Sequence, residues 1–310
     1  MTTFKFQLRF KLAPTAFIAE NTESILLTLP NAPQVLFQSR PARSLNETEL
    51  IDAISEGFLS LDAAIDYGRR VRDTITITCA LLGKGIEVTK YEEFFDQKNI
   101  KESTSGQAYI QPNSIDGLIV YPQAAKIEYR GWELSAKAGT HAEHFRQVFS
   151  RSFDLTENLN GRLSLAFELY NSHHFEVSLK ARFLQLISVI ECLADRQQKK
   201  DVIVAHVREL VEISKEQLIP TEDISQEDIN DFISRLSDLK RESITNACRN
   251  LVRKHLGDNE SATFKECYDI RSKLAHTGVI PKGTDLFAHY SKLDYIVRLL
   301  LHSLVSRQAT

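Results

Sequence analysis

One short segment carries an arginine and a histidine that could do phosphodiester chemistry together. Arg271 and His276 lie five residues apart near the end of a stretch with helical periodicity. A guanidinium binds a phosphate through paired hydrogen bonds and neutralises its charge. An imidazole exchanges a proton near neutral pH. This pair of residue types therefore suffices, in principle, to cleave a phosphodiester without a metal ion.

The spacing of the two residues limits how they can share one site. Five residues at roughly 100° each place the side chains about 140° apart around an unbroken helix. Either the helix ends before His276, which Gly278 and Pro281 favour, or a second copy of the chain completes the site. The plainer alternatives are that Arg271 pairs with a nearby acid on the helix surface and that His276 interacts with the helix dipole.

Two further residues are expected to support this segment. Glu191 lies within an apolar helical run, and a carboxylate in such a place needs a partner. We expect it to pair with a Lys or Arg of a neighbouring helix, including Arg271, rather than to act in catalysis. Tyr268 stands one turn before Arg271 and Ser272, and it is expected to pack with its hydroxyl in water. The alternative for Tyr268 is stacking on a base.

A group of cations could contact an RNA backbone, although a solvated helix end is the interpretation we favour. The group comprises Arg249, Arg253, Lys254 and Lys273. The whole chain has 38 basic and 41 acidic residues and a net charge of -3, so any RNA contact would have to come from a local patch.

Composition excludes several other classes of protein. The four cysteines have no CxxC pair, and neither His141 with His144 nor His173 with His174 has a third ligand at a suitable spacing, so no metal is expected. No cofactor-binding motif is present, and no cofactor is expected. No segment resembles a signal peptide or reaches the length of a membrane span, which predicts a cytoplasmic protein that does not contact a membrane.

The first part of the chain predicts a small mixed domain of short strands, residues 1–140. Phe4–Leu12 alternates apolar and polar residues, as a half-buried strand does. Ser60 can cap a helix that Gly83 and Gly85 would end, although the β-branched run 74–78 leaves a helix followed by a strand as an alternative. Further short strands are expected at residues 24–29, 34–38, 86–89, 108–111, 117–121, 126–129 and 132–135.

The second part, residues 141–310, predicts a bundle of about five or six helices, which makes the chain an α+β protein. Helices are expected at residues 158–175, 177–194, 202–213, 227–256, 264–276 and 285–306. The closing helix carries Leu293, Ile296 and Leu300 on one face, which fits either a core or a dimer interface.

Two local patterns make residues 141–310 resemble the HEPN superfamily, in particular its Apea-like branch. The first is the apolar helix 183–193, which leads into Glu191. The second is residues 268–278, with the Arg-x4-His spacing of Arg271 and His276. This resemblance implies a helical bundle that forms a homodimer, with the active site at the dimer interface.

The resemblance also implies a metal-independent endoribonuclease. His276 would act as general base or acid at a ribose 2′-OH or at the leaving oxygen, and Arg271 would bind the scissile phosphate, leaving 2′,3′-cyclic phosphate ends. Such proteins act as toxins in prokaryotic anti-phage defence, so a phage-derived or protein trigger is expected, with residues 1–140 as sensor or RNA-positioning domain. Ser272 stands where the family often has a polar or acidic residue; it could orient a water or His276, but it cannot replace an acid. The alternatives are a non-catalytic module that binds RNA or protein and a plain dimerisation domain.

Overall fold

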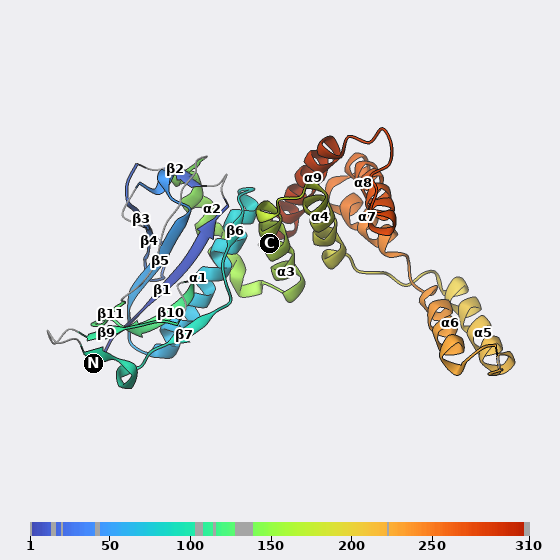
Figure 1. The fold of residues 1–310 in the computed structure, drawn as a ribbon, viewed down its shortest axis with the longest axis horizontal. Helices are drawn as coiled ribbons and strands as arrows, with labels where there is room; N and C mark the ends of the chain where they lie inside the picture. The colour runs from blue at the N-terminus through green and yellow to red at the C-terminus, as the bar shows by residue number, and fades with distance from the viewer. Residues whose placement is uncertain are drawn as a thin grey trace. The chain divides into compact units, whose positions relative to one another are not determined.

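The computed structural model describes residues 2–13, 17–19, 21–40, 44–102, 108–113, 116–127, 139–221 and 223–306. The chain forms two compact units. Unit 1 comprises Met1–Val189 with Leu301–Thr310, and unit 2 comprises Ile190–Leu300. The predicted α+β class is confirmed, because a mixed sheet of short strands precedes a helical region (Figure 1).

Unit 1 is built around a sheet with the strand order β3-β4-β5-β1-β10-β7, in which β6 pairs with the end of β1. The pairs among β3, β4, β5, β1 and β10 are antiparallel, and β10 pairs with β7 in parallel. The strands are β1 (Phe4–Leu12), β3 (Ser24–Leu27), β4 (Val35–Ser39), β5 (Leu50–Phe58), β6 (Ile86–Glu87), β7 (Glu92–Phe94) and β10 (Gly117–Pro122). One small sheet consists of β8 (Lys101–Glu102), β9 (Ala108–Ile110) and β11 (Lys126–Ile127). Another pairs β2 (Phe17–Ala19) with β12 (Gly139–His141).

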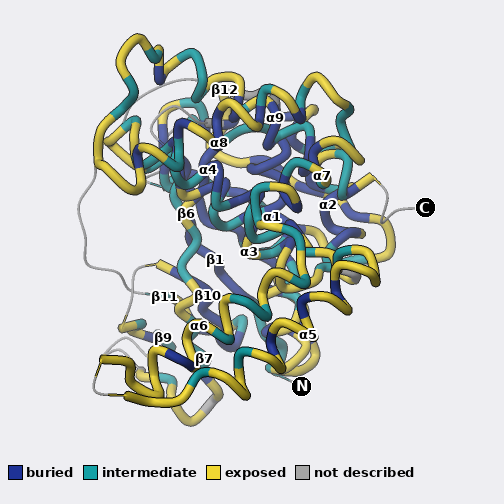
Figure 2. Tube along the Cα trace, turned by 90° about the vertical axis from the view of Figure 1, so that its right-hand side faces the viewer, coloured by how far each residue is buried: buried dark blue, intermediate teal, exposed yellow. Residues whose placement is uncertain are grey.

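The central strand β1 was predicted, whereas its neighbour β5 was not. β1 is buried along much of its length (Figure 2). On one face Phe6, Leu8 and Phe10 enter the apolar core. On the alternate positions Gln7 donates to Asp52 of β5 at 2.6 Å and Arg9 does so at 2.9 Å. The predicted strand at residues 132–135 lies outside the described residues.

Helix α1 (Leu61–Leu81) packs on the sheet and runs unbroken through the β-branched segment. Ser60 caps it as predicted, accepting a hydrogen bond from the Ala63 N–H. The hydroxyls of Thr74 and Thr78 each donate to the carbonyl four residues earlier at 2.7 Å, which accommodates these residues within the helix. The alternative of a helix followed by a strand is therefore wrong.

Gly68 sets the close approach of α1 to the sheet. A Cβ atom at this position would lie 2.6 Å from a methyl carbon of Leu118 on β10 and 3.3 Å from the ring of Phe6 on β1. A larger residue would meet the Leu118 side chain and the Phe6 ring, so at least the Leu118 side chain would have to move. The absence of a side chain therefore lets α1 bury its apolar face against the strands.

Helix α2 (Ala142–Leu155) contributes to the apolar core that covers the sheet, although the predicted domain boundary at residue 140 assigns it to the helical domain. Phe145 and Phe149 are buried in the same apolar cluster as β1 and β4. Their rings lie 5.7 Å and 5.6 Å from that of Phe37. Helix α3 (Gly161–Ser172) also belongs to unit 1, so the compact units divide the chain later than the predicted domains do.

The helices of unit 2 follow the predicted order with one exception. The predicted helix 227–256 is wrong, because the chain forms α6 (Gln226–Asp238) and α7 (Ile244–Leu256) instead. The others are α5 (Asp201–Gln217), α8 (Asp258–Thr277), the end of α4 (Leu179–Leu193) and most of α9 (Leu286–Ser306). Leu293, Ile296 and Leu300 of α9 are buried, so they belong to the core.

The break between α6 and α7 has a long-range cause. The Lys199 N–H donates to the Lys240 carbonyl at 2.8 Å, and the Glu242 N–H donates to the Gln197 carbonyl at 3.0 Å. Arg196 adds two hydrogen bonds to Asp238, at 3.0 and 2.8 Å. This pairing of residues 196–199 with 238–242 closes the base of the α5–α6 hairpin, whose helices are largely exposed (Figure 2).

Candidate functional site

Glu191, Tyr268 and Arg271 form one hydrogen-bonded cluster between α4 and α8. The Tyr268 hydroxyl donates to Glu191 Oε1 at 2.7 Å. Arg271 Nη2 lies 3.2 Å from Oε1 and 3.3 Å from Oε2 of the same carboxylate. The Arg271 guanidinium carbon also lies 5.4 Å from the centre of the Tyr268 ring. The predicted pairing of Glu191 with Arg271 is thus confirmed.

Arg271 is held in place without being fully engaged. Its side chain is 30% exposed, and its hydrogen bond and ion pair with Glu191 use only Nη2 within the described chain. A guanidinium has five N–H donors, so those on Nε and Nη1 remain open to an oxyanion. The Glu191 carboxylate balances the charge of Arg271, which means that an incoming phosphate would have to share the guanidinium with it.

Tyr268 is a buried packing residue, as predicted. Its hydroxyl was expected to lie in water, but it is hydrogen-bonded to Glu191 instead. Tyr268 is 6% exposed, and its ring packs against Phe264. Burial raises the pKa of Tyr268 to about 12, and the hydrogen bond and charge of Glu191 add to this effect. The side chain of Thr245 on α7 partly opposes this rise in pKa. Thr245 was not predicted, because nothing in its local pattern marks it and only the packing of α7 on α8 brings it near.

Cys248 lies close to the same cluster and is poorly suited to act as a nucleophile. Burial raises the pKa of its thiol to about 12, and the negative charge of Glu191 contributes to the rise. A thiol with such a pKa is protonated at neutral pH and reacts slowly. The chemistry available here is therefore that of Arg271 and of the residues that follow it on α8.

His276 is exposed and lies on the same unbroken helix as Arg271. α8 continues to Thr277, and Gly278 then adopts a left-handed conformation with φ of 70°, its N–H donating to the Leu274 carbonyl at 2.8 Å. The helix does not end before His276. Five residues at 1.5 Å each separate Arg271 and His276 by about 7.5 Å along the axis, in addition to the angle of about 140° around it. One chain does not bring the two side chains to one point.

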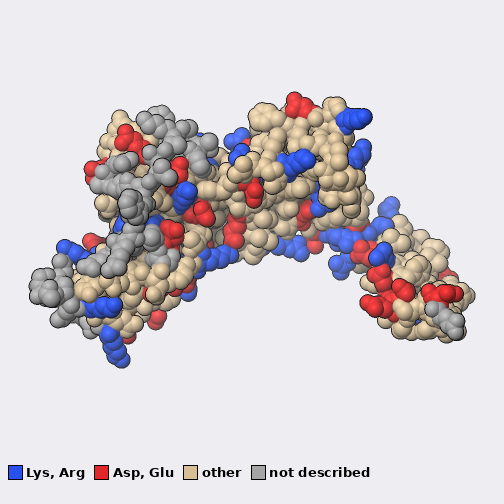
Figure 3. Space-filling view, in the orientation of Figure 1, with Lys and Arg blue, Asp and Glu red and all other residues tan. Residues whose placement is uncertain are grey.

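The remaining predicted residues differ in how well they could meet a ligand. Ser272 is half-buried and makes no side-chain hydrogen bond to the described part of the chain. Arg249 is half-buried, and its Nε atom has no hydrogen-bond partner in the part of the chain that the structure describes. Arg253 is paired with Asp258 at 2.9 Å. Lys254 and Lys273 are exposed. The face drawn in Figure 3 intersperses both signs of charge.

Comparisons with protein-family models, curated proteins and solved structures find no match to this chain. Within the described residues, no group of three His, Cys, Asp or Glu side chains is placed to hold a metal ion. The helices described here include none that is both long and apolar enough to cross a bilayer.

Proposed function

We propose that this protein is a metal-independent endoribonuclease of the HEPN type, in which Arg271 and His276 from two protomers form each active site. Arg271 binds the scissile phosphate and stabilises the charge that develops on it. His276 takes the proton from the ribose 2′-OH or gives one to the leaving oxygen. The products carry 2′,3′-cyclic phosphate and 5′-OH ends, and a phage-derived or protein trigger controls the activity.

The observation that carries this proposal is that Arg271 is held in position while part of its guanidinium stays accessible. It is fixed by Glu191 and Tyr268, partly exposed, and keeps donors on Nε and Nη1. A guanidinium held by a carboxylate loses less rotational freedom when it binds a phosphate than a mobile surface arginine does. Glu191 thus acts as a positioning residue for Arg271, and Tyr268 positions Glu191.

A second protomer is the arrangement that the helix geometry favours. Because α8 is continuous through His276, the two side chains cannot converge within one chain. A two-fold dimer would place Arg271 of one α8 against His276 of the other, twice over. Val279 and Phe287, in and after the connection that follows α8, are 64% and 65% exposed. They supply apolar surface close in sequence to His276 for such a contact.

A cleavage assay with matched variants tests the proposal. Wild-type protein, Arg271→Ala and His276→Ala are incubated with tRNA and mRNA in EDTA, and the fragment ends are mapped. We expect His276→Ala to lower the cleavage rate by about 10²–10⁴-fold, the usual contribution of general acid–base catalysis. Lys265→Ala is the control, since Lys265 is on the same helix and pairs with Asp269 at 2.7 Å. Cleavage by His276→Ala at the wild-type rate would refute the proposal.

The second candidate is a non-catalytic module that binds RNA or protein. The observation that favours it is that Glu191 balances the charge of Arg271, which weakens the attraction of this site for a phosphate. This candidate predicts RNA binding without turnover, with the same affinity in wild-type protein and His276→Ala. The binding curves of the same preparations distinguish it from the nuclease.

A further inference from the structure

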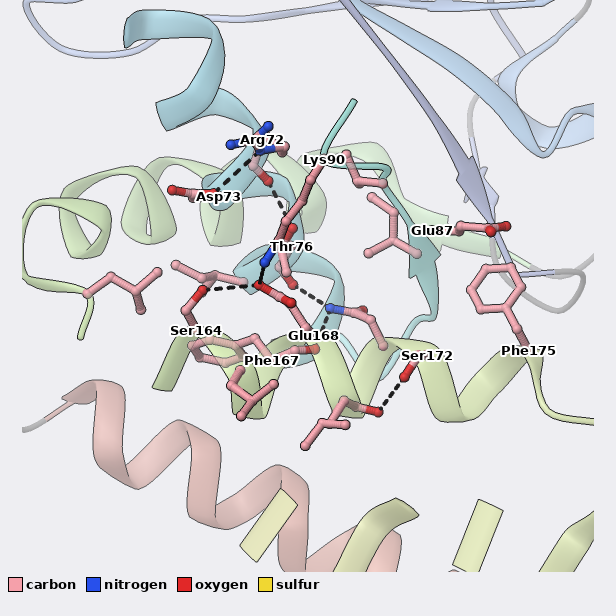
Figure 4. Close-up of a pocket in the computed structure, with 17 residues that line it drawn as sticks. Arg72, Asp73, Thr76, Glu87, Lys90, Ser164, Phe167, Glu168, Ser172 and Phe175 are labelled. Atoms are coloured by element: carbon pink, nitrogen blue, oxygen red, sulfur yellow. Dashed lines mark hydrogen bonds and ion pairs between the residues drawn. The ribbon is translucent and has the colours of Figure 1, made fainter. Parts of the chain in front are cut away.

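Unit 1 contains a cavity that none of the predicted site residues lines. It has a volume of about 380 Å³ and lies between α1, α3 and the segment that carries β6 (Figure 4). This is the size range of small-molecule sites. Its apolar wall includes Ile77, Val88, Leu165, Phe167 and Phe175. The cavity can therefore enclose the apolar part of a small molecule.

The charged groups that line the cavity carry more negative than positive charge. Three are carboxylates, Asp73, Glu87 and Glu168, and two are cations, Arg72 and Lys90. Arg72 is already engaged outside the cavity, because its Nη1 donates to Glu92 at 2.7 Å. Its Nε atom lies 3.8 Å from Asp73, too far for a hydrogen bond. The Asp73 carboxylate thus keeps acceptor capacity for a positively charged group.

Asn171 provides an acceptor that the described residues leave unused. The residue is 2% exposed and lines the cavity. Its Nδ2 donates to the carbonyls of Thr76 and Phe167, each at 2.9 Å, which fixes the orientation of the amide. Among the residues that the structure describes, its Oδ1 has no hydrogen-bond partner. A buried carbonyl oxygen without a donor is costly, and an N–H of a ligand would satisfy it.

The Lys90 ammonium group already occupies one carboxylate of the cavity, that of Glu168. The ammonium lies 2.9 Å from Glu168 on α3, and Figure 4 shows the Lys90 side chain reaching across to that carboxylate. The Lys90 side chain is 74% exposed and that of Glu168 is 38% exposed. An ion pair this open to water is weak, so a ligand cation can displace Lys90 at small cost.

We propose that this cavity binds a small amphipathic amine, whose apolar body fills the wall formed by α1 and α3 and whose ammonium group pairs with Asp73 and Glu168. The ligand ammonium takes the place of the Lys90 ammonium at Glu168, and its N–H groups face acceptors rather than donors. An anionic ligand is disfavoured, because three carboxylates line the cavity against two cations, and one of these cations, Arg72, is held by Glu92 at 2.7 Å. This binding activity is independent of RNA cleavage and does not rest on it.

Three probes that share one skeleton test the charge of the ligand. Phenethylamine, 2-phenylethanol and phenylacetate are titrated into the full-length protein by ligand-observed NMR. They place a cation, a neutral group and an anion on the same apolar body. We expect phenethylamine to bind about tenfold more tightly than either of the others, which corresponds to one cation–carboxylate contact of moderate strength. Equal binding of all three, preference for phenylacetate, or no binding of phenethylamine at millimolar concentration would overturn the proposal.

Matched variants locate the binding. Asp73→Asn and Glu168→Gln preserve shape and are each expected to weaken phenethylamine about tenfold while leaving 2-phenylethanol unchanged. Asp66→Asn is the control, because Asp66 is on the same helix with its side chain 79% exposed and does not line the cavity. Unchanged phenethylamine affinity in both test variants, with the fold intact by circular dichroism, would show that the amine binds elsewhere.

Discussion

Glu191 determines what Arg271 can do. A carboxylate within an apolar helix must find a partner, and here it accepts from both Tyr268 and Arg271. The sequence predicted this pairing because Glu191 is the acid that interrupts the apolar face of α4. It did not predict that the Tyr268 hydroxyl would be buried against the same carboxylate, since the local pattern gives no direction for a side chain.

Removing the Tyr268 hydroxyl should destabilise the protein in a pH-dependent way. Tyr268→Phe is expected to lower the free energy of unfolding by about 1.5–3 kcal/mol at pH 8, because a hydrogen bond to a charged group is lost. The folded-state pKa of Tyr268 is raised to about 12 from an ordinary value near 10. Its stabilising effect is therefore fully present below pH 10 and is lost as pH rises towards 12.

Urea unfolding of wild-type protein and Tyr268→Phe between pH 8 and pH 11 measures this effect. The difference in unfolding free energy between the two proteins should shrink above pH 10. Other groups with raised pKa values, such as Tyr67, titrate in both proteins and cancel in that difference. A difference that stays constant across the range would contradict the role assigned to the hydroxyl.

At the scale of elements, the sequence predicted the helices and strands that have a clear hydrophobic pattern of their own. It missed the features that depend on residues far away in the chain. β1 and α1 show clear alternation and a clear cap, and both were predicted. β5 contains Asp52, which reads as an exposed polar residue until Gln7 and Arg9 of β1 are placed beside it. The segment 239–243 has no Gly or Pro to end a helix, so only its pairing with residues 196–199 reveals the break.

Asp52 should be among the most sensitive positions in the sheet. It is 2% exposed and accepts from Gln7, Arg9 and Arg40. Asp52→Ala leaves the charge of Arg9 in the interior without this counter-charge, so we expect a loss of about 3–5 kcal/mol in unfolding free energy.

Glu56→Ala provides the matched control for this position, because Glu56 lies on the same strand and is exposed. It should change the unfolding free energy by less than about 0.5 kcal/mol. Thermal or urea unfolding of both variants makes the comparison. Similar small effects at the two positions would show that the network around Asp52 contributes little to stability.

For the molecule as a whole, the α+β class followed from the change of hydrophobic period along the chain. The division into compact units did not, because the aromatic face of α2 reads equally well as part of a bundle or as a cover for a sheet. The candidate site was predicted in part, as Arg271 and Glu191 do meet. The cavity of unit 1 was not predicted, since its lining comes from residues 72–90 and 159–175, which no local motif connects.

The most direct test of a shared active site is complementation between two inactive variants. Arg271→Ala and His276→Ala are prepared separately, then unfolded, mixed in equal amounts and refolded together. Half of the resulting dimers contain one of each variant, and each of these has one intact Arg271–His276 pair, so the mixture should recover about a quarter of the wild-type cleavage rate. Mixed dimers that form and cleave no faster than either variant alone would contradict the account.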